Sequence, residues 1–244
     1  MTKSLYLRCT PGAIAERVLL TGDPARIERI VGMMDGGQII AQNREFLVAS
    51  GSVDGLPFTA ISSGIGAPSA AIAIEEAAQL GAKAFVRVGT MMGIGLPMGC
   101  FVLSSGAARF EGTSNAYLPA AFPAVPDWPL AQSLLEAGQS AGWATRAGIT
   151  ATYDAFYPSM APALVGRGLP DLELLRSGQV IALDMETSLL YTLALRLGIA
   201  AASFCVVTNN ADPFEIIDAG LREKTEEGLI RAVFAGLARW SPAS

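Results

Sequence analysis

Two acidic residues lie where a predicted strand meets a predicted helix. Residues 180–183 are apolar and β-prone, Asp184 and Glu186 follow on either side of Met185, and residues 187–197 show the pattern of an apolar helix. Ligands bind at this edge of an open α/β sheet, and the hydroxyls of a sugar are suitable partners for the Glu186 carboxylate. Helix capping or pairing with an arginine would also account for either acid, and the local pattern leaves these alternatives open.

The joint between the first predicted strand, residues 17–21, and the helix predicted over 25–34 has the parts of an anion site. Gly22 ends the strand, Asp23 suits the helix cap, and Arg26 lies in the first turn. A glycine turn, the free N–H groups of a helix start and an arginine together can bind an oxyanion. Taken alone, an ordinary turn with a surface arginine is the simpler interpretation.

Polar residues accompany two further apolar strands. Arg87 lies inside the strand predicted over 83–89 and Thr90 comes directly after it, whereas Asn209 follows the strand predicted over 201–207. An arginine inside an apolar strand needs an anionic partner, from the protein or from a ligand. Because ligands collect where such strands end, we expect these groups to gather around one ligand.

Composition excludes several classes of function. The chain has 244 residues, 51% hydrophobic and 16% charged, with a net charge of −5 and no basic run, which argues against a nucleic-acid partner. No apolar stretch is long enough to span a membrane, so no membrane partner is expected. The three cysteines are scattered, which indicates a cytoplasmic protein without a zinc site, and the lack of histidine rules out histidine-based catalysis.

The elements that must position these residues alternate between strand and helix along the whole chain. This order predicts an α/β fold, a single domain over residues 1–244 with three α/β/α layers and a central mixed sheet. The β-rich segments 44–62, 85–104 and 145–152 suggest that the sheet is partly barrel-like. A long loop predicted over 153–169 could cover a pocket.

Several stretches, in order along the chain, resemble the nucleoside phosphorylase superfamily of uridine phosphorylases and hexameric purine nucleoside phosphorylases. They are TGDPARIERI (21–30), NREF (43–46), SSGIGAPSAAIAIEEAAQLGA (62–82), RVGT (87–90), FPAV (122–125), GITATYDAFYP (148–158), DMETSLL (184–190) and CVVTNN (205–210). Together they span nearly the whole chain and are specific, although each alone is not. FPAV, the DAFYP stretch and Asn209 are more similar to the uridine branch.

The resemblance implies reversible phosphorolysis of a nucleoside to free base and ribose 1-phosphate. Inorganic phosphate would be the co-substrate, with no other cofactor and no metal, in a homodimer or hexamer. The implied phosphate-binding residues are Gly22, Arg26, Arg87 and Thr90, with Arg44 donated by a neighbouring subunit. The implied ribose-binding residues are Tyr6, Thr90, Met185 and Glu186. The implied base-binding residues are Met91, Met92, Phe156, Met160 and Asp184, and the implied catalytic residues are Arg87, Glu186 and Asn209.

The base site departs from the family pattern. A Gln and an Arg follow DAFYP in the uridine branch, but Met160 and Pro162 stand at those positions here, and Met91-Met92 replaces Thr-Gly after RVGT. The purine branch has an acid where this chain has Asn209. The expectation is therefore a uridine phosphorylase-like enzyme with altered base preference. The alternatives are a purine nucleoside phosphorylase, a nucleosidase that uses water, and a non-catalytic relative that binds a nucleoside-like or nucleotide-like ligand.

Overall fold

A mixed sheet runs through the part of the chain that the computed structural model describes, residues 3–155, 171–212 and 214–241. Its strands lie in the order β10-β9-β6-β7-β8-β5-β1-β4-β3-β2. The strands are β1 (Arg17–Thr21), β2 (Asp35–Asn43), β3 (Phe46–Val53), β4 (Leu56–Ser62), β5 (Ala84–Gly93), β6 (Phe101–Phe110), β7 (Thr145–Tyr153), β8 (Val180–Asp184), β9 (Ala200–Ala211) and β10 (Phe214–Ile216). The helices are α1 (Pro24–Val31), α2 (Ala67–Gln79), η1 (Thr113–Ala116), α3 (Trp128–Ser140), α5 (Leu172–Ser177), α6 (Thr187–Leu197) and α7 (Ala219–Arg239).

Part of this sheet closes on itself. β5 pairs with β9 in parallel and, at its far end, with β8 in antiparallel register, Met92 opposite Leu183. β9 continues to β6, β6 to β7 and β7 to β8, so the ring returns to β5. The described strands therefore confirm the predicted mixed sheet with a barrel-like part, and β1, β4, β3 and β2 extend it as an open sheet.

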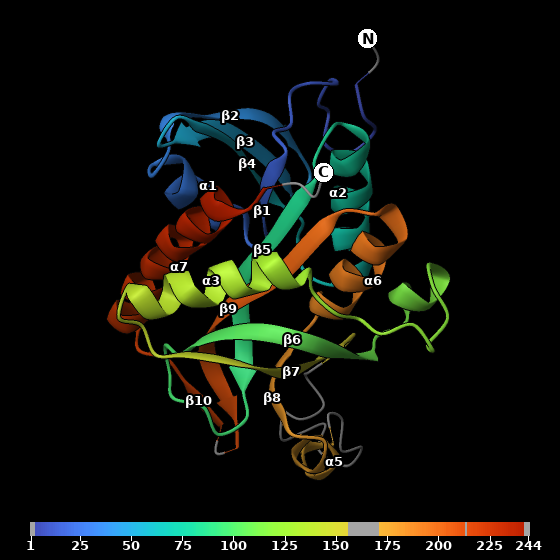
Figure 1. The fold of residues 1–244 in the computed structure, drawn as a ribbon, viewed down its shortest axis with the longest axis vertical. Coiled ribbons are helices and arrows are strands. Elements are labelled where there is room, and N and C mark those ends of the chain that lie inside the picture. The colour runs from blue at the N-terminus through green and yellow to red at the C-terminus, as the bar shows by residue number, and fades with distance from the viewer. Residues whose placement is uncertain (1–2, 156–170, 213, 242–244) are drawn as a thin grey trace.

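Helices cover both faces of the sheet (Figure 1). Residues of β1 alternate between the two cores: Leu19 packs with α1, α3 and α7, whereas Val18 and Leu20 pack with α2 and α6. Side chains of a strand point to opposite faces in turn, so an apolar run buried on both sides is what a covered strand requires. The three layers predicted from the sequence are confirmed.

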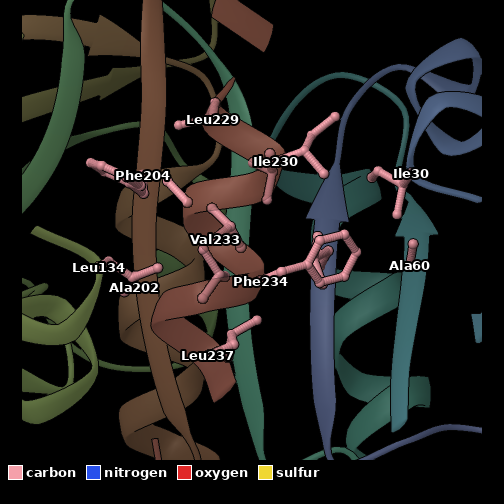
Figure 2. Packing of buried hydrophobic residues seen from close by; sticks show 14 of the residues in the cluster. Ile30, Ala60, Leu134, Ala202, Phe204, Leu229, Ile230, Val233, Phe234 and Leu237 are labelled. Atoms are coloured by element: carbon pink, nitrogen blue, oxygen red, sulfur yellow. The ribbon is translucent and has the colours of Figure 1, made fainter. Parts of the chain in front are cut away.

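Helix α7 packs on the sheet beside α1. Figure 2 shows Ile230 and Phe234 of α7 pointing toward Ile30 of α1 and Ala60 of β4. The ring of Phe234 meets that of Phe58 edge to face, with 5.0 Å between centroids. Burying such aromatic pairs stabilises the contact by about 0.5–1.5 kcal/mol beyond the area term. The packing brings the first turns of α7 beside α1, where two arginines of the predicted site region lie.

Two of the strands beside the predicted site run further than expected. β5 was expected to end at Gly89 but continues to Gly93, so Thr90, Met91 and Met92 lie within it. β9 likewise continues to Ala211. The extra residues pair with each other and with β8 where the ring closes, a long-range contact that local sequence does not reveal. The hairpin predicted over 44–62 is present as β3 and β4, but β2, mostly exposed and paired with β3, was not predicted.

The start of α1 and the end of α6 were predicted from their capping residues, whereas α1 ends at Val31 and not at residue 34 as expected. Asp23 accepts a hydrogen bond from the N–H of Ala25 at 2.9 Å and so caps α1 with Pro24 in the first turn, as expected. Gly198 ends α6 in the left-handed region, at φ 68°, where glycine has no steric penalty. None of the helices in the described residues is long and apolar enough to cross a lipid bilayer.

Candidate active site

A cavity of about 640 Å³ opens where the predicted site strands converge. It is bordered by the turn after β1, the loop after β4, the second half of β5, the joint between β8 and α6, and the end of β9. β1, β4, β5 and β9 run parallel, so these segments meet at one edge of the sheet. The predicted residues that line the cavity are Gly22, Arg26, Arg87, Thr90, Met91, Met92, Asp184, Met185, Glu186 and Asn209.

Arg87 and Glu186 contact each other inside this cavity. The Nε of Arg87 lies 3.1 Å from Oε2 of Glu186, and Nη2 of Arg87 donates to the same oxygen. The second carboxylate oxygen accepts from the N–H of Gly66 at 2.6 Å, just before α2. Both side chains are buried, so these charge-assisted contacts are stronger than at the surface. The carboxylate is thereby held at the cavity wall.

Asp184 binds both the start of a helix and an arginine. Its carboxylate accepts from the N–H of Thr187, the first residue of α6, at 3.1 Å, and from the hydroxyls of Thr187 and Thr152. The same carboxylate forms an ion pair with Nε of Arg87, Oδ2 to Nε 3.3 Å. Burial raises the pKa of Asp184, and the charge of Arg87 opposes that rise. Asp184 therefore orients Arg87 as well as bordering the cavity, and its contact with a base stays a prediction.

A thiol completes the surroundings of Arg87. Nη1 of Arg87 donates to the sulfur of Cys205, 2.7 Å away, on the neighbouring strand β9. Burial raises the pKa of the Cys205 thiol, and this effect is larger than the lowering by the charge of Arg87. The sulfur therefore accepts this bond as a protonated thiol. Burial lowers the pKa of Arg87, but Cys205, Glu186 and Asp184 outweigh that effect and the net shift is upward. Arg87 is thus a permanent cation.

Arg26 offers an unpaired donor. Its Nη1 donates to the hydroxyl of Thr21 at 2.6 Å, and its Nη2 to Oε1 of Glu226 at 3.2 Å. The Nε–H is buried and finds no acceptor within the described residues. A buried donor without a partner costs about 1–3 kcal/mol, which an oxyanion in the cavity would recover. Arg26 lies in the first turn of α1, where the helix N–H groups also favour an anion.

The end of the cavity where the sequence predicts the base is mostly apolar. Met91, Met92 and Leu183 line it, and Asn209 adds an amide whose oxygen accepts from the hydroxyl of Thr208 at 3.3 Å. Sulfur and methyl groups adapt to flat rings, and the amide can both donate and accept hydrogen bonds. This wall could hold a planar heterocycle with one polar edge.

Arg222 borders the cavity and was not predicted. It lies in the first turns of α7, half exposed, and its Nε donates to Oε1 of Glu226 at 2.9 Å. In the sequence Arg222 and Glu226 form an ordinary i,i+4 pair in a charged stretch, which is typical of a solvated helix face. The only hint was that this helix is the next element predicted after the strand that Asn209 follows.

Two predicted residues lie elsewhere. Among the described residues, Arg44 and Tyr6 are apart from the cavity lining but next to each other, with the guanidinium carbon of Arg44 5.9 Å from the centre of the Tyr6 ring. Arg44 is exposed in the turn between β2 and β3, at φ 55°, a left-handed conformation that costs a side-chain residue about 1–2 kcal/mol. Phe156 and Met160 lie outside the described residues.

Comparison with known proteins gives consistent matches over most of the chain. The family profile described as "Phosphorylase superfamily" matches residues 16–233. Uridine phosphorylase of Thermococcus kodakarensis is 38% identical over 232 residues, 89% of this chain and 81% of that protein. Guanosine phosphorylase of Halorubrum lacusprofundi is 33% identical over 243 residues, 96% of each chain. The crystal structure of uridine phosphorylase from Vibrio fischeri matches with a TM-score of 0.88 and 26% identity, covering 98% of this chain and 99% of that one.

Proposed function

The chain belongs to the phosphorylase superfamily, and from that premise we propose that it is a nucleoside phosphorylase. It would convert a nucleoside and inorganic phosphate into a free base and a pentose 1-phosphate, reversibly. Phosphate is the co-substrate, and the reaction needs no further cofactor. The observation that carries the proposal is the pairing of Arg87 with Glu186 in a cavity that Arg26 also lines.

We propose that phosphate binds between the turn of Gly22, the side chains of Arg26 and Arg87, and Thr90. The buried Nε–H of Arg26 and the guanidinium of Arg87 supply donors in fork geometry, which suits tetrahedral oxyanions. The start of α1 adds its own N–H groups. Arg87 would turn part of its guanidinium from the protein carboxylates to the phosphate.

Glu186 and Met185 would hold the pentose. A carboxylate has about four acceptor positions, of which Gly66 and Arg87 use three, so one hydroxyl can join without further change. The glycosidic C–N bond then breaks, its electron pair leaves with the base, and a phosphate oxygen bonds to the anomeric carbon. The negative charges of phosphate and Glu186 stabilise the positive charge that develops on the sugar.

The base would contact Met91, Met92 and Asn209, with Phe156, Met160 and Asp184 as further proposed contacts. Two of the relatives carry different names, uridine phosphorylase and guanosine phosphorylase. Because this end of the cavity departs from the uridine pattern, both pyrimidine and purine nucleosides belong in the substrate panel. The amide N–H of Asn209 would donate a hydrogen bond to the departing base but would not transfer a proton to it.

A neighbouring copy of the chain would complete the site, in a homodimer or in a hexamer built from dimers. The ribose contact of Tyr6 and the phosphate contact of Arg44 are supported by their shared position on the surface. The backbone of this segment is tied down, since the N–H groups of Tyr6 and Leu7 donate to the Glu76 carboxylate. Arg44→Ala should raise the KM for phosphate while leaving the oligomer intact by light scattering.

The decisive experiment is release of free base from uridine and guanosine with and without inorganic phosphate. Phosphorolysis predicts that turnover needs phosphate and yields pentose 1-phosphate in equal amount to the base. Equal rates without phosphate would indicate hydrolysis instead. No turnover of any nucleoside in a broad panel would contradict the proposal.

A further inference from the structure

A buried acid on α7 holds a group of arginines at the edge of the cavity. Among the described residues, Glu226 accepts from Arg26 and Arg222 at one oxygen, 3.2 and 2.9 Å, and from Arg29 at the other, 2.7 Å. Its side chain is only 3% exposed. Two of these arginines, Arg26 and Arg222, also line the cavity, so one carboxylate fixes two cationic walls from α1 and α7.

The charges of this cluster do not cancel. Three guanidinium groups face one carboxylate in the described residues, which leaves a surplus of positive charge at this side of the cavity. The surroundings of Arg87 are the opposite, since one arginine there faces the two carboxylates of Asp184 and Glu186. The surplus at Arg26 therefore favours an anion on this side, whereas the two carboxylates beside Arg87 offset part of the attraction that Arg87 alone would exert.

Glu226 stays ionised over the working pH range. Burial raises the pKa of its carboxyl, but the charges and hydrogen bonds of Arg26 and Arg222 outweigh burial and hold it below its ordinary value. A permanent carboxylate can keep Arg26 extended beneath the cavity, with Thr21 fixing the other guanidinium nitrogen. Without it, Arg26 could relax toward other acceptors or toward solvent.

We propose that Glu226 is a positioning residue for the phosphate subsite, holding Arg26 and Arg222 so that their free donors converge on the anion. This inference rests on the proposed function, because it assumes that the anion is the phosphate co-substrate. Glu226 itself does not touch the substrate. Its contribution is geometric, since its own negative charge would weaken phosphate binding if it acted through charge alone.

Glu226→Asp separates geometry from charge. It keeps the carboxylate but draws it back by one methylene, so it cannot reach arginines of both helices at their present distances. The affinity for inorganic phosphate alone, measured by calorimetry, should fall about tenfold or more, as expected for loss of aligned charge-assisted donors. In kinetics the KM for phosphate should rise by a similar factor, with the KM for nucleoside within about twofold.

The adjacent acid is a matched control. Glu227 lies on the exposed side of the same helix and pairs with Arg231 at 2.7 Å. Glu227→Asp makes the same chemical change one residue along and should leave phosphate affinity unchanged. If shortening any acid on α7 had a general effect, the phosphate affinity of both variants would fall by the same factor. That result would overturn the inference.

Glu226→Gln tests the opposite explanation and serves if the aspartate variant fails to fold. Positioning predicts weaker phosphate binding, because the NH2 of the amide cannot accept from an arginine and the neutral side chain no longer holds the cluster. If Glu226 acted through charge alone, Glu226→Gln would bind phosphate more tightly, and that result would overturn the inference. A variant that binds phosphate with wild-type affinity and has only lost thermal stability would overturn it too. Calorimetry with phosphate needs no turnover, so an inactive wild type would contradict the proposed function while this test still decides the role of Glu226.

Discussion

Arg87 and Glu186 form an ion pair in the cavity: Nε of Arg87 lies 3.1 Å from Oε2 of Glu186, and Nη2 of Arg87 donates to the same oxygen. The proposed phosphate and the proposed sugar therefore compete for groups that already form a pair. Phosphate that draws Arg87 away would release Oε2 of Glu186 for a second sugar hydroxyl. The two substrates are expected to strengthen each other's binding through this ion pair.

Replacing Glu186 should damage the chemical step. Glu186→Ala removes the carboxylate proposed to face the sugar, and turnover at saturating substrates should fall by about two orders of magnitude or more, as for loss of a charge-stabilising contact. Steady-state base release measures it. Glu186→Gln keeps a hydrogen-bonding oxygen and should lose less. An unchanged rate in the alanine variant would refute the sugar role.

The guanidinium shape of Arg87 should matter as well as its charge. Arg87→Lys keeps one positive charge but cannot contact Glu186, Asp184 and Cys205 together with phosphate, because an ammonium lacks the planar fork. Catalytic efficiency for phosphate should drop about 100-fold, roughly the loss of one or two charge-assisted bonds. The surface variant Arg231→Lys is the control. If the Arg87→Lys variant kept its dependence on phosphate unchanged, the anion site would have to lie elsewhere.

Cys205 should contribute to stability through Arg87. Cys205→Ala removes the sulfur that accepts from Nη1 and leaves a buried charged donor unpaired. The free energy of unfolding should decrease by about 1–3 kcal/mol, measured by urea denaturation. Cys205→Ser retains an acceptor and should lose less than the alanine variant. Equal losses would mean that side-chain volume, not the contact with Arg87, decides the effect.

The Glu226 cluster should make the free energy of unfolding depend on pH in the acidic range. The pKa of Glu226 is lower in the folded protein than in the unfolded chain, despite burial, because Arg26 and Arg222 face it, with Arg29 at its second oxygen. Its stabilisation is full above the ordinary glutamate pKa of about 4.3 and is lost as pH falls through the lower folded value. The difference in unfolding free energy between wild type and Glu226→Gln should therefore shrink as pH falls below about 5. Parallel curves would contradict this.

Local patterns predicted much of the fold because its elements have clear ends. β1 has the bounds expected from its apolar run, and α6 begins and ends where its flanking residues indicated, at Glu186 and Gly198. The barrel closure could only be suggested from composition, since Met92 opposite Leu183 is a pairing between segments about 90 residues apart. Such a register depends on the whole sheet.

The site was predicted less evenly than the fold. Residues at joints between a strand and a helix, such as Arg26 and Asp184, could be found because a charge beside apolar sequence demands a partner. Which group is that partner could not be predicted from the sequence. Arg87 faces two protein carboxylates and a thiol. Glu226 was overlooked because burial of one acid in a charged helical stretch depends on how α7 packs against α1.

β5 carries Arg87 where it pairs with both β1 and β9, and Met91 beyond the last residue that pairs with β1. Backbone geometry alone separates these side chains, by about 13 Å for four extended residues. A library randomised at the codons for Met91 and Met92, the proposed base contacts, would therefore sample new leaving groups while the proposed phosphate contact of Arg87 stays in place. That division makes the strand a natural starting point for directed evolution of modified nucleoside synthesis.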